Sequence, residues 1–108
     1  NQGDRMIDLI EIEIRCGIIP KYNILLIPNK NICYINNKKY EVKEVFLYKV
    51  ISIIKTLENM DIKKKNIDEE EYFIRIINNN KEEKIHGVGN CSLNYKQLIR
   101  LFEELVYE

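Results

Sequence analysis

The feature that most constrains the fold is a strict alternation of apolar and charged residues near the start of the chain. From position 10 to position 16 isoleucine or cysteine occupies every even position, and Glu11, Glu13 and Arg15 occupy the odd ones. A period of two places alternate side chains on opposite faces of a β-strand. Residues 7–16 are therefore predicted to form a strand with one buried face and one solvent-facing face.

Further apolar runs, separated by turn residues, predict more strands. They are residues 22–27, 32–35, 39–42, 72–77 and 82–88. Isoleucine supplies most of their apolar positions, since the chain contains 20 isoleucines and no alanine, and β-branched side chains favour strands. Asparagine pairs between the runs predict tight hairpin turns, because asparagine tolerates left-handed backbone.

Two segments carry helical periodicity instead. Between residues 43 and 59, Phe46, Val50, Ile53 and Leu57 recur at helical spacing and predict a largely buried helix. The C-terminal segment carries its apolar residues on one helical face, with Asn94 as the predicted cap. Residues 61–71 are rich in lysine and glutamate, and they are predicted to form a solvated loop.

The order strands, helix, strands, helix predicts an α+β fold. In this fold both helices cover one face of an antiparallel sheet of about five to six strands. The length of 108 residues suits one domain. Residues 1–5 are polar and precede Met6, so they are interpreted as a linker or an addition, and the predicted domain covers residues 6–108.

Charge and cysteine content exclude several classes of protein. The 17 basic and 17 acidic residues balance, which argues against a nucleic-acid partner. No apolar run approaches the roughly 20 residues of a membrane span. Three widely spaced cysteines do not form a disulfide framework, so free thiols and a cytoplasmic location are expected.

Residues 86–92 form the candidate ligand loop. His86 and Cys91 could make a nucleophilic pair, and Gly87 and Gly89 lie between a predicted strand and helix, where amides can bind an anion. The loop lacks the complete dinucleotide and P-loop motifs, and sharp turns also use glycine. It supports the alternative function, which is a small-ligand or anion-binding domain or a minor enzyme.

Metal binding and carboxylate catalysis have weaker support. Four zinc ligands are available by number, but they lack the short spacings of structural zinc sites; they are Cys16, Cys33, Cys91 and His86. Glu11 and Glu13 could act as acid and base, yet their alternation is typical of a solvent-facing strand surface. We therefore expect no metal or cofactor and favour a non-enzymatic protein.

The first hairpin resembles a known pattern. Cys16, Gly17, Pro20 and Tyr22 match the opening of a family of small uncharacterised bacterial domains, which begins Cys-x-Gly-x-Cys-Pro-x-Tyr. Ile19 stands where that family has its second cysteine, and the spacing before Gly17 differs. The resemblance is confined to residues 15–34 and implies no activity.

A protein-binding module is the favoured function, since no catalytic motif stands out. The predicted architecture is similar to that of small bacterial immunity proteins, which neutralise a toxin domain. Glu69, Glu70, Glu71 and Tyr72 form the predicted interface, because the acidic run could mimic a toxin's nucleic-acid substrate and tyrosine is enriched at interfaces. The expected partner is a protein such as a toxin domain, and the chain is expected to be a monomer or an edge-strand homodimer.

Overall fold

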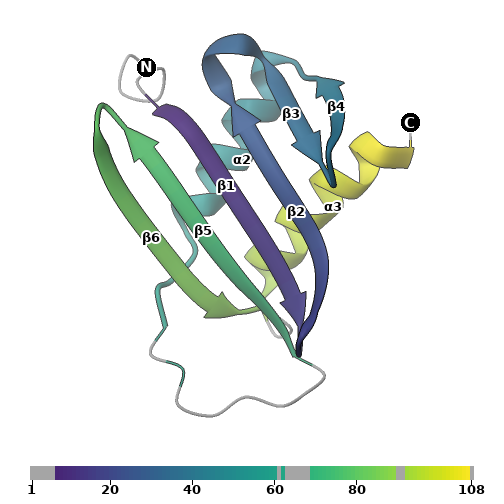
Figure 1. Cartoon of the computed structure of the whole chain (residues 1–108), viewed down its shortest axis with the longest axis vertical. Coiled ribbons are helices and arrows are strands. Elements are labelled where there is room, and N and C mark those ends of the chain that lie inside the picture. The colour runs from purple at the N-terminus through teal and green to yellow at the C-terminus, as the bar shows by residue number, and fades with distance from the viewer. Residues whose placement is uncertain (1–6, 61, 63–68, 90–91, 108) are drawn as a thin grey trace.

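The computed structural model describes residues 7–60, 62, 69–89 and 92–107. It is an α+β fold with a six-stranded antiparallel sheet and two helices, as predicted (Figure 1). The strands are β1 (Ile7–Cys16), β2 (Ile19–Ile27), β3 (Ile32–Ile35), β4 (Lys38–Glu41), β5 (Glu70–Asn78) and β6 (Lys81–Val88). The helices are α2 (Glu44–Ile54) and α3 (Leu93–Tyr107), and a short 3₁₀ turn, η1, spans Pro28–Lys30. The predicted linker at residues 1–5 and residue Cys91 lie outside the described residues.

The sheet order is β4-β3-β2-β1-β5-β6, so β1 is central and pairs antiparallel with β2 and β5. Two-residue turns connect β3 to β4 and β5 to β6. Asn36, Asn37, Asn79 and Asn80 have φ angles of 49°, 72°, 55° and 68°. Left-handed backbone at both central residues suits a type I′ turn, which matches the twist of the flanking strands. The predicted asparagine turns are confirmed.

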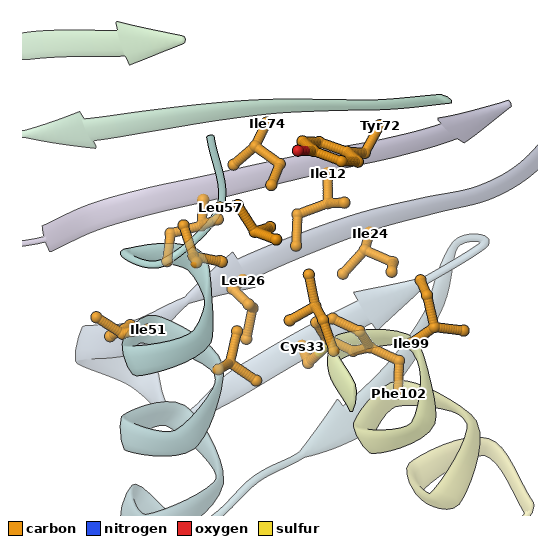
Figure 2. Close-up of a cluster of buried hydrophobic side chains, with 14 of the residues drawn as sticks. Ile12, Ile24, Leu26, Cys33, Ile51, Leu57, Tyr72, Ile74, Ile99 and Phe102 are labelled. Carbon is orange, nitrogen blue, oxygen red and sulfur yellow. The ribbon is translucent and has the colours of Figure 1, made fainter. Parts of the chain in front are cut away.

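The core lies between the sheet and the two helices. Both helices lie on the same side of the sheet (Figure 1). Ile10, Ile12 and Ile14 are at most 1% exposed, and Ile12 and Ile74 point from the sheet toward the helical layer (Figure 2). The predicted alternation therefore holds for Ile10, Ile12 and Ile14, while Cys16 at the end of β1 is half-buried. Glu11, Glu13 and Arg15 lie on the opposite side of the sheet, which we call the open face.

The structure corrects several predicted boundaries. Strand β2 begins at Ile19 rather than residue 22, because the tight turn at Gly17 lets Ile19 pair with Cys16. Helix α2 ends at Ile54 rather than near residue 59, because the chain leaves the helix through tighter turns in which Leu57 N–H donates to the Ile54 carbonyl. Strand β5 begins at Glu70, so the predicted loop 61–71 extended two residues too far. Helix α3 begins at Leu93, and the Ser92 hydroxyl accepts from the Tyr95 amide at 3.2 Å, so Ser92 rather than Asn94 provides the cap.

Neither described helix is long and apolar enough to cross a membrane. Within the same described residues, no group of three or more histidine, cysteine, aspartate or glutamate side chains is arranged to hold a metal ion.

Candidate functional site

The open face carries apolar and charged side chains in cross-strand rows. In the first row Tyr34, Leu25, Glu11, Arg75 and Lys84 lie side by side across five strands. All of these except Lys84 are half-buried. In an antiparallel sheet with one solvated face, that face is usually polar. Leu25 and Tyr34, which lie next to each other in this row, depart from that expectation.

The second row contains Asn23, Glu13, Phe73 and His86. The rings of Phe73 and His86 stack with centroids 4.3 Å apart and an interplanar angle of 17°. The His86 ring nitrogen Nε2 also bonds Glu71 Oε2. Glu71 is 6% exposed, so the ring of His86 is held by an aromatic neighbour and a buried carboxylate.

Most of the described charges on the open face are paired. Arg75 bonds Glu11 through Nη1, and its Nε lies 2.5 Å from Glu82 Oε2. Arg15 Nε lies 2.7 Å from Glu13 Oε1. Because acidic and basic groups alternate across the strands, the surface presents mixed charge instead of a field of one sign.

A hollow of about 320 Å³ lies in the open face between the two rows. Its polar lining includes Glu13, Asn23, Arg75 and His86, and Phe73 contributes an aromatic ring. A concave place with an aromatic ring and several polar groups can hold a small molecule or a side chain of a partner.

The structure buries two of the four predicted interface residues, Glu71 and Tyr72, and Glu70 is half-buried. Tyr72 is 1% exposed, and its hydroxyl donates to the Glu58 carbonyl at 3.0 Å. Glu71 is buried beside His86, as described above. Glu70 accepts from the Tyr95 hydroxyl at 2.7 Å and bonds Lys21. Glu69 is half-buried immediately before β5. These residues therefore form no free acidic surface of the kind that the sequence suggested.

Burial of Glu70 disfavours its ionised form, but the hydrogen bonds from Lys21 and Tyr95 outweigh that effect. The pKa of Glu70 is therefore lowered below its ordinary value of 4.5. A carboxylate with a lowered folded-state pKa stabilises the fold above its ordinary value, and this contribution is lost as pH falls through the folded-state pKa.

We therefore expect Glu70→Gln to lower the free energy of unfolding by about 1 kcal/mol at pH 7. The difference between variant and wild type should shrink as pH falls below the ordinary pKa of 4.5 and through the lower folded-state pKa. Urea denaturation between pH 7 and pH 3 measures it, with Glu104→Gln on the exposed side of α3 as the control. A difference that stays constant with pH would contradict the assignment.

The two glycines of the predicted ligand loop accommodate tyrosine rings. Gly87 lies within β6, and a Cβ there would lie 2.3 Å from the Tyr72 hydroxyl oxygen. A Cβ on Gly89 would lie 2.2 Å from the Tyr95 ring. The Gly89 amide already donates to the Glu70 carbonyl at 2.9 Å. Close packing thus accounts for both glycines, and this amide is not available to an anion.

His86 is also a strand residue rather than part of a loop. Its amide donates to Asn59 Oδ1 at 2.9 Å, and its carbonyl accepts from the Met60 amide at 2.7 Å. Cys91, its predicted partner in catalysis, lies outside the described residues. Cys33 is fully buried, and burial raises the pKa of its thiol to about 12.

The hairpin that carries the family resemblance joins β1 to β2. Gly17 has a φ angle of 65°, which lets the chain turn there. Ile18 and Ile19 beside it are 91% and 67% exposed. The hairpin tip therefore adds apolar surface at one end of the sheet.

Sequence reasoning missed Leu25, Tyr34, Phe73 and Arg75 as surface residues. For Phe73 and Arg75 a signal was present, since both alternate with the buried Tyr72 and Ile74 along β5. Their grouping with Leu25 and Tyr34 depends on the pairing of strands far apart in sequence, which periodicity within one strand does not reveal.

The chain was compared with protein-family models, curated proteins and solved structures, and none of them matches it.

Proposed function

We propose that the protein is a non-enzymatic binding module that recognises another protein through the open face of its sheet. The observation that carries this proposal is the composition of the sheet face that neither described helix covers. Leu25, Tyr34 and Phe73 are half-buried there among paired charges. Aromatic and aliphatic side chains surrounded by polar groups are characteristic of protein interfaces.

The concrete form of the proposal is an immunity protein that neutralises a toxin domain. This specific function is supported by the small α+β architecture, through analogy with bacterial immunity proteins of similar size and fold class. Glu70 and Glu71 would not imitate a nucleic-acid substrate, since both carboxylates are bonded within the fold. The paired acidic and basic groups of the open face instead favour a partner surface of mixed charge.

The test is affinity capture from the native host by three forms of the protein, read by quantitative mass spectrometry. Leu25→Glu places a charge at the centre of the open face, whereas Tyr48→Glu changes an α2 residue that is 59% exposed. We expect a stoichiometric partner to be retained by wild type and Tyr48→Glu and reduced about tenfold or more with Leu25→Glu.

Circular dichroism and thermal melting establish that both variants fold. A partner that is kept by Leu25→Glu and lost by Tyr48→Glu would place the interface on the helices and overturn the proposal. A toxin domain as the captured protein would support the immunity function in particular.

A small-ligand function has one supporting observation, which is the hollow of about 320 Å³ beside Phe73 and His86. Its volume lies at the lower end of the range for ligand pockets. Two results together would favour this alternative. Folded wild-type protein would capture no partner, and a small molecule would raise the melting temperature of wild type but not that of an Asn23→Ala variant.

A further inference from the structure

Strand β6 forms one border of the sheet (Figure 1). The amide and carbonyl of His86 bond Asn59 and Met60, so both backbone groups point away from β5. The β5–β6 pairing has no irregularity. Because backbone groups alternate in direction along a strand, the amides and carbonyls of Glu82 and Lys84 also point outward.

Within the described residues, no hydrogen bond reaches these outward groups of Glu82 and Lys84. Unpaired amides and carbonyls on a sheet border form a template for another strand. At the His86 end of the border, Asn59 and Met60 already fill the positions that such a strand would take. The unoccupied part is therefore the segment Lys81–Ile85.

We propose that this segment pairs with the same segment of a second copy of the chain, antiparallel and about a two-fold axis at Glu83. The dimer would join the two sheets into one of twelve strands, six from each copy. This inference goes beyond the proposed function, because it uses the sheet border and leaves the open face accessible.

The hydrogen-bonding pattern selects this register. Outward-pointing residues must face each other across an antiparallel pair, so Glu82 and Lys84 can face only Glu82, Lys84 or their outward-pointing neighbours. Centring the pair on Lys84 would bring Glu82 opposite His86, whose backbone is already occupied. Centring it on Glu82 would bring Lys84 opposite the turn at Asn80. Only the axis at Glu83 lets all the outward groups of Glu82 and Lys84 bond.

Charge complementarity favours the same register. With the axis at Glu83, Glu82 of each copy lies opposite Lys84 of the other, which makes two opposite-charge pairs. The other two registers place Glu82 opposite Glu82 or Lys84 opposite Lys84. The side chain of Lys84 is 74% exposed, so it can reach across the seam.

One contact opposes the dimer. Glu83 lies opposite Glu83 of the second copy on the helical side of the sheet, and like charges facing each other destabilise a strand pair. Lys81 of the second copy lies diagonally next to each Glu83 and partly compensates this repulsion. The paired segment, Lys81–Ile85, is short and buries little surface. The dimer should therefore depend on protein concentration and be weaker than an obligate dimer.

The test is sedimentation velocity of the full chain at concentrations from about 10 µM to about 1 mM. Wild type should shift from monomer toward dimer across this range. Lys84→Glu and Glu82→Lys should each raise the dissociation constant about tenfold, because each replaces attraction by repulsion at two positions. Mixing the two variants in equal amounts should restore dimerisation, since positions 82 and 84 of one copy are then opposite in charge to positions 84 and 82 of the other.

Two further variants test whether pairing at the β6 border is what causes dimerisation. Lys84→Pro removes an outward amide but no β5–β6 hydrogen bond, and it should abolish the dimer in a folded chain. Lys39→Glu makes a matched charge change at the opposite border, on β4, and should have no effect. Wild type that stays monomeric at every concentration, or a mixture of charge variants no better than either alone, would overturn the proposal.

Discussion

Replacing Gly89 by alanine is expected to lower the free energy of unfolding by about 3 kcal/mol. The new Cβ would lie 2.2 Å from Cδ2 and 2.4 Å from Cγ of Tyr95. The Tyr95 ring has little room to move, because its hydroxyl donates to Glu70 and its face stacks on Tyr72 with centroids 5.5 Å apart. Urea denaturation at pH 7 measures the loss.

A double-mutant cycle is the control for this effect. Gly89→Ala should cost much less in a Tyr95→Ala background, since the clashing ring is then absent. The result also separates the two interpretations of the glycines. Unchanged stability of Gly89→Ala together with lost binding of inorganic phosphate would contradict the packing explanation and restore the anion-binding one.

Phe102→Ala is expected to lower the free energy of unfolding by about 3–5 kcal/mol. Phe102 is 2% exposed and lies between α3 and the sheet (Figure 2). Its ring meets that of Phe46 edge to face, with centroids 5.8 Å apart and an angle of 79°. The substitution therefore removes both buried area and an aromatic contact, in a domain whose total stability is of the order of 5–15 kcal/mol.

The matched control lies on the same helix. Tyr107 is 82% exposed, so Tyr107→Ala should change the free energy of unfolding by less than about 0.5 kcal/mol. Equal losses for the two variants in urea denaturation would show that α3 does not dock through Phe102.

Local periodicity was sufficient for the fold class and for most of its elements. The buried positions of β1 follow from alternation within seven residues, and the asparagine turns follow from the backbone that each residue tolerates. Both are properties of neighbouring residues. Helix and strand ends were less accurate, because caps such as Ser92 compete with nearby residues of similar propensity.

The candidate site could not be predicted in the same way. Glu70 is held by Lys21, 49 positions earlier, and by Tyr95, 25 positions later. A run of glutamates read alone indicates a solvated surface, whereas these partners bring Glu70 and its neighbours into the fold. The position of the open face likewise depends on the packing of α2 and α3 against the other side of the sheet, which periodicity within a single strand does not reveal.

The central place of β1 has a consequence for how the chain is synthesised. Its pairing with β2 is local, whereas the contact between Glu11 and Arg75 spans 64 positions. During elongation on the ribosome the first four strands can assemble before β5 has been made. At that stage the side of β1 that later pairs with β5 is unpaired, and β1 is rich in isoleucine. Early folding intermediates are therefore the species of this chain most prone to self-association. Chaperone protection would matter most at this stage of synthesis.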